Sequence, residues 1–426
     1  MSDAQPEVAP TSTDLDTAPP VEHVDVVVVG AGPAGTAAAA VLARAGRTVA
    51  VVDKAVFPRD KCCGDGLTTL ALRELDQLGL DPADVPNWRT VESAWLRSPS
   101  GREVNVPLPP RELGLFAATT PRRELDHALV ELAEREGVRL RLGQALQRVD
   151  QTADHVDVAT AGAGSIRASF LVAADGMWSP TRKMLGLGES DYLGEWHAFR
   201  QYARNVTGTA AERLYVWFEP DLLPGYMWSF PLPGNRVNVG FGVPRDGSRT
   251  GKDLKALWPD LLRRPHIAAA LGPAVELEDR HTAWPIPAAI DRVPLSSGRT
   301  LFVGDAARAT DVMTGEGIGQ ALLTGRLAAE AIIDAAHLGP TDVRARYERA
   351  VRAHLFADHR MSVVLSRALA HERGARGAIR LVGLSNWTRR NFARWMFEDE
   401  PRAALLTPSR WHRGFLSQPG AYRNRP

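Results

Sequence analysis

The chain has 426 residues, of which 44% are hydrophobic and 24% are charged, so it can bury a large core. This length predicts about two or three lobes. A formal net charge of +1 provides no general attraction for nucleic acid or membranes, and no nucleic-acid partner is expected. The sequence shows no apolar run of the ~18 residues that a membrane span needs, no secretory signal and no metal-binding motif.

The N-terminal residues 1–21 are rich in Pro, Ala, Thr, Ser and Asp and lack periodicity, which predicts a disordered lead. The two cysteines, Cys62 and Cys63, are neighbours and cannot form an ordinary structural disulfide. So few cysteines indicate a reducing compartment, and we expect a cytoplasmic protein.

Residues 24–54 have the pattern strand, glycine turn, helix, strand. The apolar run 24–29 leads into G-x-G-x-x-G, and an alanine-rich segment with high helix propensity follows. The glycines permit a tight turn and a close approach of a pyrophosphate, which the helix N-terminus then binds. An acid at the end of the second strand accepts from a ribose hydroxyl, which favours FAD or NAD over NADP. The predicted dinucleotide contacts are Gly30, Gly32, Pro33, Ala34, Gly35, Asp53 and Lys54.

The next segment mixes helices and short strands. Pro121 suits the first turn of a helix, and a preceding threonine can cap it. The predicted elements are a loop at 55–66, a helix at 67–78, short strands within 83–118, a helix at 121–136 and strands at 138–142, 156–158 and 170–173, the last ending at Asp175-Gly176.

Residues 190–245 are rich in strand and hairpin signals. Two strands, 226–230 and 237–241, flank a Gly234-Asn235 turn. Large aromatic side chains alternate along both, so we expect one shared aromatic face. Residues 252–272 are predicted to be helical.

The C-terminal third begins with a buried strand at 301–303 and a helix at 317–336, followed by helical and then irregular chain from 342. From His371 onward there are eleven arginines and four acids, a local excess of +7, interleaved with Trp and Phe. Two interpretations are open: this tail binds a lipid surface or an anionic headgroup, or it is a solvated arginine-rich face with its tryptophans packed onto the body.

Several separated motifs together select a flavin. Each Asp-Gly or Gly-Asp pair closes a strand, where open α/β sheets bind ligands, and its carboxylate can accept from a ribityl hydroxyl. The helix that begins at Gly317 can stabilise negative charge on the reduced ring. The further residues assigned to the cofactor are Arg122, Asp175, Gly304, Asp305, Gly315, Gly317 and Ile318.

In this order and spacing the motifs resemble FAD-dependent oxidoreductases of the glutathione-reductase type, in the branch that includes p-hydroxybenzoate hydroxylase. The resemblance implies an α/β fold: a Rossmann-like FAD-binding domain, an inserted mixed or antiparallel sheet domain for substrate, and a helical C-terminal region. The expected boundaries are 22–84, 118–188 and 294–340 for the FAD domain, 85–117 and 189–293 for the sheet domain, and 341–426 for the Arg/Trp-rich C-terminal region.

Two stretches of the sequence indicate one family within this branch. F-P-R-D-K-C-C-G-D-G-L at 57–67, and L-P-G-Y-M-W-S-F-P at 223–231 with V-N-V-G-F-G at 237–242, resemble signatures of the geranylgeranyl reductase family. That family reduces carbon–carbon double bonds of isoprenoid chains. The resemblance implies that Cys63 and Gly64 lie near the flavin and that Cys63, Tyr226 and Trp228 are catalytic. It also implies an apolar substrate cavity, lined by Tyr226, Trp228, Phe230 and Phe241.

Reduction of a double bond needs a hydride from the flavin and a proton. Our hypothesis is that Cys63, or a water near it, relays that proton. Against it, a free cysteine is often only a small buried hydrophobe, and alternating aromatics are often only core. The electron donor is expected to be NAD(P)H or another reductant, although no second dinucleotide motif is visible.

The chain departs from the family pattern near the presumed ring. Arg308 replaces a glycine, Val312 replaces a proline, and Cys62 replaces the proline before Cys63. Three alternatives to a prenyl reductase therefore stay open: a hydroxylase or epoxidase, a halogenase of a secondary-metabolite pathway, and a flavoprotein whose structural FAD accompanies a non-redox cyclisation.

Overall fold

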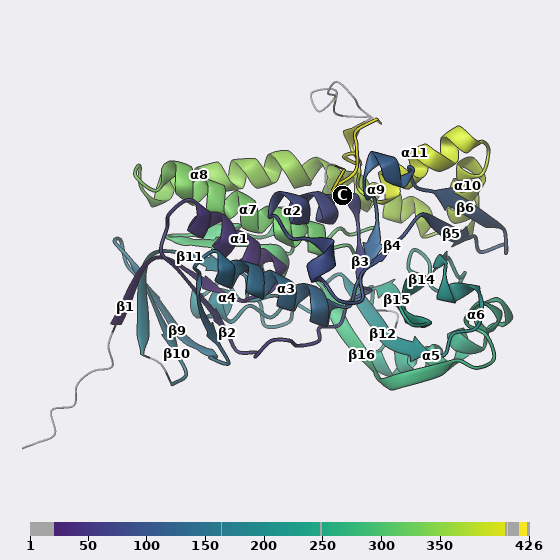
Figure 1. Ribbon diagram of the computed structural model, residues 1–426, viewed down its shortest axis with the longest axis horizontal. Helices are drawn as coiled ribbons and strands as arrows, with labels where there is room; N and C mark the ends of the chain where they lie inside the picture. The colour runs from purple at the N-terminus through teal and green to yellow at the C-terminus, as the bar shows by residue number, and fades with distance from the viewer. Residues whose placement is uncertain (1–20, 163, 248, 405–406, 408–416, 424–426) are drawn as a thin grey trace, which may run out of the picture.

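The computed structural model describes residues 21–162, 164–247, 249–404, 407 and 417–423. Apart from Val21, the predicted disordered lead lies outside these residues. The described chain forms two large sheets and a helical C-terminal part, which confirms the predicted α/β fold class (Figure 1). Where the chain is described, no helix is both long and apolar enough to cross a membrane.

An eight-stranded sheet forms one half of the molecule, in the order β17-β18-β11-β1-β2-β8, with β10 and β9 added to β11. The apolar β1 pairs in parallel with β2 and β11, and its Val26 to Val28 are fully buried. The strands are β1 (Val21–Val29), β2 (Val49–Asp53), β8 (Arg139–Leu142), β9 (Leu146–Gln151), β10 (Val156–Thr160), β11 (Ser165–Ala173), β17 (Ser296–Ser297) and β18 (Thr300–Phe302).

Helices cover this sheet, and α1 packs on both α3 and α7. Small residues permit the close approach, since a Cβ on Gly325 of α7 would lie 2.1 Å from the Ala34 carbonyl oxygen of α1. The helices are α1 (Pro33–Arg44), α2 (Thr69–Gln77), α3 (Arg122–Arg135), α4 (Pro180–Met184), α7 (Ile318–Ala335) and α8 (Pro340–Val351).

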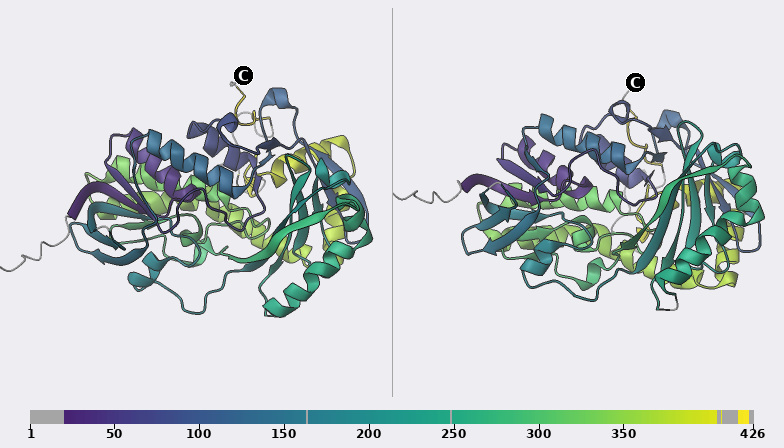
Figure 2. Two further views of the ribbon diagram at one scale, coloured as in Figure 1. Left: turned by 60° about the horizontal axis from the view of Figure 1, so that its bottom comes forward. Right: turned by 90° about the horizontal axis from the view of Figure 1, so that it is seen from below.

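A seven-stranded sheet forms the other half, in the order β16-β12-β15-β14-β13-β5-β6. One of its faces packs on α5 (Gly251–Arg263) and α6 (Pro265–Leu271) (Figure 2). The strands are β5 (Ser93–Arg97), β6 (Glu103–Pro107), β12 (Trp196–Arg204), β13 (Leu214–Trp217), β14 (Tyr226–Leu232), β15 (Arg236–Pro244) and β16 (Glu276–Ile286). A third, three-stranded sheet contains β3 (Gly66–Leu67), β7 (Ala118–Thr119) and β4 (Arg89–Thr90). The domain boundaries given above remain a prediction.

The predicted hairpin is confirmed: β14 and β15 pair antiparallel, and Gly234 and Asn235 both have positive φ, of 74° and 55°. The predicted threonine cap of α3 is wrong. The Thr120 hydroxyl donates to the Pro86 carbonyl at 3.4 Å, and the Arg122 backbone N–H donates to Asp65 Oδ1 at 3.3 Å. The Asp65 carboxylate, from the 55–66 loop, therefore accepts the N–H hydrogen bond at the start of α3 in place of a threonine cap.

The C-terminal helices lie beside the seven-stranded sheet (Figure 1). A π-helical segment, Arg352–Phe356, continues α8 into α9 (Ala357–Leu369). The next two helices, α10 (Glu372–Val382) and α11 (Asn386–Met396), pack on β6 through Ile379, Val382 and Ala393. This part of the chain is thus an integral layer of the molecule.

Candidate active site

A cavity of about 420 Å³ is lined from both halves of the molecule. Its walls come from the glycine turn before α1, the loop at 61–68, strands β12 and β14, the loop before α7, and helices α9 to α11. Side chains that are far apart in the sequence therefore line one cavity.

The glycine turn leaves an open helix N-terminus at this cavity. No side chain caps α1 at Gly32, and its first turn contains no acid. A Cβ on Gly32 would have only Arg59 Nη2 within 4 Å, at 3.8 Å. Unpaired N–H groups, the helix dipole and a nearby guanidinium suit a pyrophosphate.

The outer glycines of the motif have structural roles. Gly30 has a φ of 108°, and a Cβ on Gly35 would lie 1.8 Å from the Gly30 carbonyl oxygen. Asp53 accepts from the N–H groups of Ala31 and Ala55 at 2.7 and 2.8 Å, which ties the turn to β2. The neighbouring Lys54 is exposed to solvent.

The predicted residues of the two later loops reach the cavity wall: Gly304, Asp305, Gly315, Gly317 and Ile318. The Asp305 carboxylate pairs with Lys61 Nζ at 3.0 Å, so a cation lies there too. The N–H groups of Ile318 and Gly319 donate to Glu316 Oε1, both at 3.0 Å. The start of α7 is therefore already capped by a carboxyl group, which the sequence interpretation did not include.

Asp175 differs from expectation. Its carboxylate accepts from Ser179 Oγ at 2.6 Å and from the Thr181 N–H at 2.8 Å, so it holds the start of α4. Its neighbours Ala174 and Gly176 line the cavity, but Asp175 does not. Ala174 and Gly176 at the end of β11 thus lie beside the cofactor region, whereas the Asp175 carboxylate caps the start of α4.

Arg122 and Cys63 lie together in the cavity wall. The Arg122 guanidinium holds Asp126 through two bonds of 2.7 Å, and both side chains are buried. Burial raises the pKa of the Cys63 thiol to about 11, and the charge of Arg122 offsets only part of this effect. Cys63 is therefore a protonated thiol at neutral pH.

The aromatic wall comes from β14. Tyr226, Trp228 and Phe230 all line the cavity, with ring centres 6.1 and 6.2 Å apart along the strand. Trp228 Nε1 donates to Asn238 Oδ1 at 3.0 Å, and the Tyr226 hydroxyl donates to the Thr314 carbonyl. These two hydrogen bonds fix the indole and the phenol in place.

Phe241 is misplaced by the sequence interpretation. It pairs with Met227 in the sheet, so it points to the face opposite Trp228. There it stacks on Phe199 at 5.1 Å and is fully buried under α5. Gly240 stands opposite Trp228 instead, where a Cβ would approach the indole to 2.4 Å. Gly240 of β15 therefore makes room for the tryptophan.

A polar network lies beneath the 60–66 loop, and the sequence analysis did not predict it. Asp65 accepts from Tyr202 and Asn238 at 2.7 and 2.8 Å, while Arg200 binds Asp60 at 3.0 Å and the Cys63 carbonyl at 3.2 Å. Burial raises the pKa of Asp65 to about 6, against the nearby charge of Arg200. The available signal in the sequence was Asn238, a polar residue within the otherwise apolar segment 237–243.

A family model described as "FAD binding domain" matches residues 23–337. The chain is 36% identical over 349 residues to the menaquinone reductase of Mycobacterium tuberculosis, covering 77% of this chain and 81% of that protein. It is 31% identical to digeranylgeranylglycerophospholipid reductase 2 of Methanopyrus kandleri, covering 73% of this chain and 77% of that one.

The chain belongs to the geranylgeranyl reductase family of FAD-dependent oxidoreductases. Among solved structures, a geranylgeranyl bacteriochlorophyll reductase-like protein of Thermoplasma acidophilum has a TM-score of 0.75 and 22% identity, over 91% of this chain and 99% of that one. A halogenase solved with FAD has a TM-score of 0.68 and 17% identity, over 89% and 84% of the two chains. Likeness at this identity shows the shared fold alone.

The residues present fit the FAD of this family. The open N-terminus of α1 suits the pyrophosphate. In the cavity wall, Gly304 and Gly315 have no side chains and so leave space for the cofactor beside the carboxylate of Asp305. Bound FAD would supply the hydride chemistry. Arg122, Cys63 and the β14 aromatics would then form the surroundings of the reacting bond.

The family departure at Arg308 has a structural explanation. The residue has a left-handed φ of 55°, a conformation that usually selects glycine. Its guanidinium carbon lies 3.3 Å from the centre of the Tyr192 ring, and its Nη2 pairs with Glu189 at 2.9 Å. These contacts offset the strain. The structure shows no contact that explains Val312.

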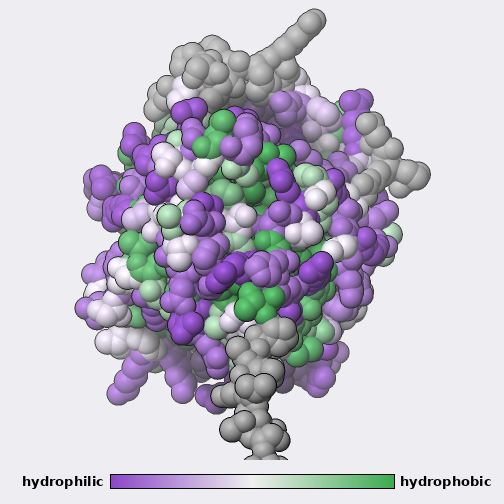
Figure 3. Space-filling model, turned by 90° about the vertical axis from the view of Figure 1, so that its left-hand side faces the viewer, coloured by the Kyte–Doolittle hydropathy of each residue, from purple (hydrophilic) through white to green (hydrophobic). Residues whose placement is uncertain are grey.

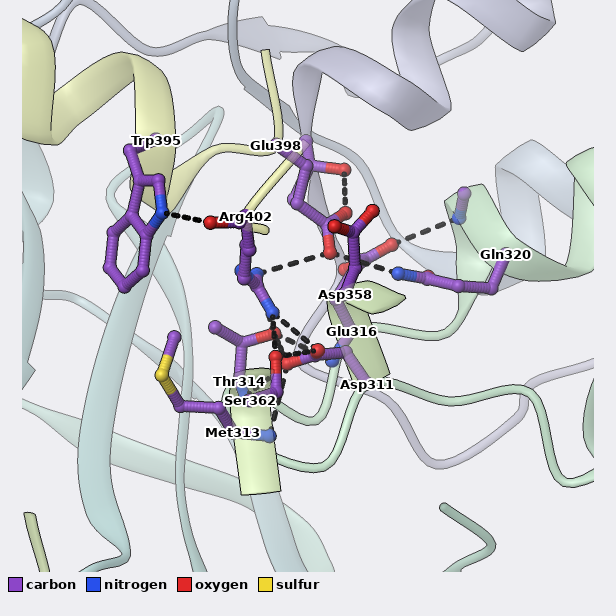
Figure 4. A network of polar contacts seen from close by, with 12 residues as sticks. Asp311, Met313, Thr314, Glu316, Gln320, Asp358, Ser362, Trp395, Glu398 and Arg402 are labelled. Atoms are coloured by element: carbon purple, nitrogen blue, oxygen red, sulfur yellow. Dashed lines mark hydrogen bonds and ion pairs between the residues drawn. The ribbon is translucent and has the colours of Figure 1, made fainter. Parts of the chain in front are cut away.

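The C-terminal region contributes to the cavity, which neither interpretation of the tail included. Ile379, Phe392 and Trp395 line it, whereas Trp387 is 63% exposed. Arg402 is buried and contacts the loop before α7 (Figure 4). The tail is thus divided between a cavity wall and an exposed surface, and its residues 405–406, 408–416 and 424–426 lie outside the described ones.

Proposed function

We propose that this protein uses reduced FAD to reduce carbon–carbon double bonds of a polyprenyl chain. The observation that carries the proposal is that the aromatic wall of Tyr226, Trp228 and Phe230 lines the same cavity as the FAD-binding elements. A prenyl chain offers no hydrogen-bonding group, so affinity for it comes from burying apolar surface. The names of the similar reductases support the same substrate class.

The chain's own residues have defined tasks in this reaction. The β14 aromatics hold the apolar chain and exclude water. Cys63 carries a thiol proton at the cavity wall, and we propose that it relays this proton to the carbon next to the one that receives the hydride. Arg122 stays charged, since the buried Asp126 raises its pKa although burial lowers it.

A monooxygenase or halogenase is the second candidate, supported only by the shared fold. The two functions differ in their use of oxygen. We expect the FAD-loaded protein, supplied with reductant and a prenyl substrate, to consume no oxygen in proportion to product. Stoichiometric oxygen uptake with an oxygenated or halogenated product would favour the second candidate.

We also propose NAD(P)H as the electron donor. Transient reduction of a bound flavin by a nicotinamide needs no separate nucleotide-binding domain, so the lack of a second dinucleotide motif in the sequence does not oppose this donor. Anaerobic addition of NADH or NADPH should bleach the bound flavin, and bleaching by dithionite alone would exclude both nucleotides.

Peripheral membrane contact is the remaining proposal. Leu381, Leu384 and Trp387, which we call the apolar edge, are 64, 70 and 63% exposed where α10 meets α11. Between residues 371 and 390 there are five arginines and one acid, an excess of +4. Apolar side chains surrounded by arginines suit an anionic lipid surface.

The position of this edge supports the same idea. Helices α9 and α10, which lead to it, line the cavity through Leu365, Ala368 and Ala378. A lipid-dissolved chain would thus reach the cavity where the protein touches the bilayer. The other end of the molecule, around β9 and β10, is mostly hydrophilic with small apolar patches (Figure 3).

A further inference from the structure

A buried polar cluster joins the C-terminal segment to the loop before α7 (Figure 4). Arg402 is 4% exposed and contacts Asp311, Ser362 Oγ at 3.2 Å and Glu398 Oε1 at 3.1 Å. Glu398 also accepts from Thr68 Oγ1 at 3.0 Å and from Gln320 Nε2 at 2.9 Å. Glu398 therefore connects the tail, α2 and α7.

The charges in this cluster do not balance. Among the described residues, four acids act on the single guanidinium of Arg402: Asp311, Glu316, Asp358 and Glu398. Burial opposes ionisation of Asp311, but Arg402, Ser362 and Thr314 together lower its pKa. Asp311 is thus the carboxylate that neutralises Arg402, and the described part of the chain holds no second cation in this cluster for the two glutamates.

The two glutamates consequently interact as a pair. Burial raises the pKa of Glu316, and the charge of Glu398 raises it further. Burial likewise raises the pKa of Glu398, partly offset by Arg402. Two buried carboxyl groups in electrostatic contact do not both ionise at neutral pH, because the second charge is strongly disfavoured.

Glu316 connects this pair to the reaction cavity, which it lines. Cys63 and Tyr226 line the same cavity, and the charge of Glu316 raises the pKa of both groups slightly. A thiol with a pKa of about 11 is a weak acid, so its proton transfer would leave a costly buried thiolate. A second acid that lines the same cavity removes that cost when it returns a proton to the thiol.

We propose that Glu316 and Glu398 share one proton and that this pair supplies the proton for each double bond reduced. The proposal rests on the proposed function. One alkene carbon takes the hydride from reduced FAD, and the π electrons form a C–H bond at its neighbour with the Cys63 proton. The Glu316 O–H bond breaks as the S–H bond re-forms, and the carboxylate pair is reprotonated from solvent.

Infrared spectroscopy of the oxidised, FAD-loaded protein at pH 7, without substrate, tests the shared proton without any turnover. We expect a carbonyl band of a protonated carboxyl group that Glu316→Gln and Glu398→Gln each reduce. Glu219→Gln is the control: burial opposes ionisation of Glu219, but His266 and Arg264 lower its pKa, so the band should persist. A band unchanged in both test variants would overturn the proposal.

Single-turnover kinetics tests the proton supply. Reduced, FAD-loaded Glu316→Gln should transfer hydrogen to a prenyl compound about 100-fold more slowly and lose the decline that the unsubstituted protein shows as pH rises. Reduction of its flavin by dithionite should be unchanged. An unaltered rate and pH profile would overturn this step. If the unsubstituted protein reduces no prenyl compound, the proposed function and the proton supply fail together, while the infrared result still decides the shared proton.

Discussion

At the scale of single residues, Cys63 connects the sequence motif to the chemistry. The structure places its thiol in the cavity wall beside Arg122, and burial keeps it protonated. Its neighbour Cys62 also lines the cavity, but its thiol donates to the Thr282 carbonyl at 3.7 Å. Adjacent cysteines therefore have different surroundings, which allows a matched comparison.

We expect Cys63→Ala to lower turnover about 100-fold or more, because a general acid contributes that order of rate. FAD should remain bound, since the glycine turn and α1 are unchanged. Turnover with a prenyl substrate and the flavin content of the purified protein provide the two measurements. Cys62→Ala should lower turnover by much less, and equal losses in both variants would remove the relay role.

Asp65 gives a prediction about stability. Its pKa rises from 3.8 to about 6 on folding, mainly because of burial. The folded state therefore binds more protons between these values, and the free energy of unfolding falls as pH rises through them. Asp65→Asn should flatten this fall by up to about 3 kcal/mol in urea titrations. An unchanged slope would contradict the burial of an ionisable group there.

At the scale of elements, the alternation of side chains along each strand could be predicted from the sequence, but the register with the neighbouring strand could not. The alternation at 226–230 correctly put Trp228 and Phe230 on one face, because side-chain direction alternates along any strand. Which face of β15 meets them depends on register, and that register turns Phe241 away. The prediction that Asp175 contacts the cofactor was wrong for a related reason. The sequence motif identifies the turn, but hydrogen bonds from Ser179 and Thr181 determine where the carboxylate points.

Gly240 and Gly242 test this register. A Cβ at Gly240 would lie 2.3 Å from the Phe199 carbonyl oxygen and 2.4 Å from the Trp228 ring, whereas at Gly242 the nearest atom is 3.6 Å away. Gly240→Ala should lower the free energy of unfolding by about 2 kcal/mol through overpacking, as measured by urea denaturation. Gly242→Ala serves as the control with a much smaller loss, and equal stability of both variants would contradict the register.

At the scale of the whole molecule, the sequence identified the FAD-binding half but not the C-terminal wall. The glycine motif is local, so it could be recognised within 24–54. The contacts of Ile379, Trp395 and Arg402 with the cavity region join residues hundreds of positions apart, and an arginine-rich composition does not distinguish a buried guanidinium from a solvated one. Removing the tail to test membrane contact would also remove cavity wall, so point substitutions are needed.

The apolar edge offers such a test. Leu381→Glu, Leu384→Glu and Trp387→Glu together should reduce sedimentation with anionic liposomes at least ten-fold, because each charge opposes insertion and repels the surface. The exposure of these side chains should leave the fold intact. Leu338→Glu, 61% exposed in the turn between α7 and α8, is the control and should still sediment. Equal sedimentation of both variants would exclude this edge as the contact.

The most direct test of the whole account is the mass of the product. Protein loaded with FAD and reduced by dithionite is incubated without oxygen with a panel of polyprenyl compounds, alongside the same compounds with saturated chains. We predict a gain of two hydrogens per reduced bond in an unsaturated chain and no change in the saturated controls. Unsaturated chains recovered unchanged from fully reduced, FAD-loaded protein would contradict the account.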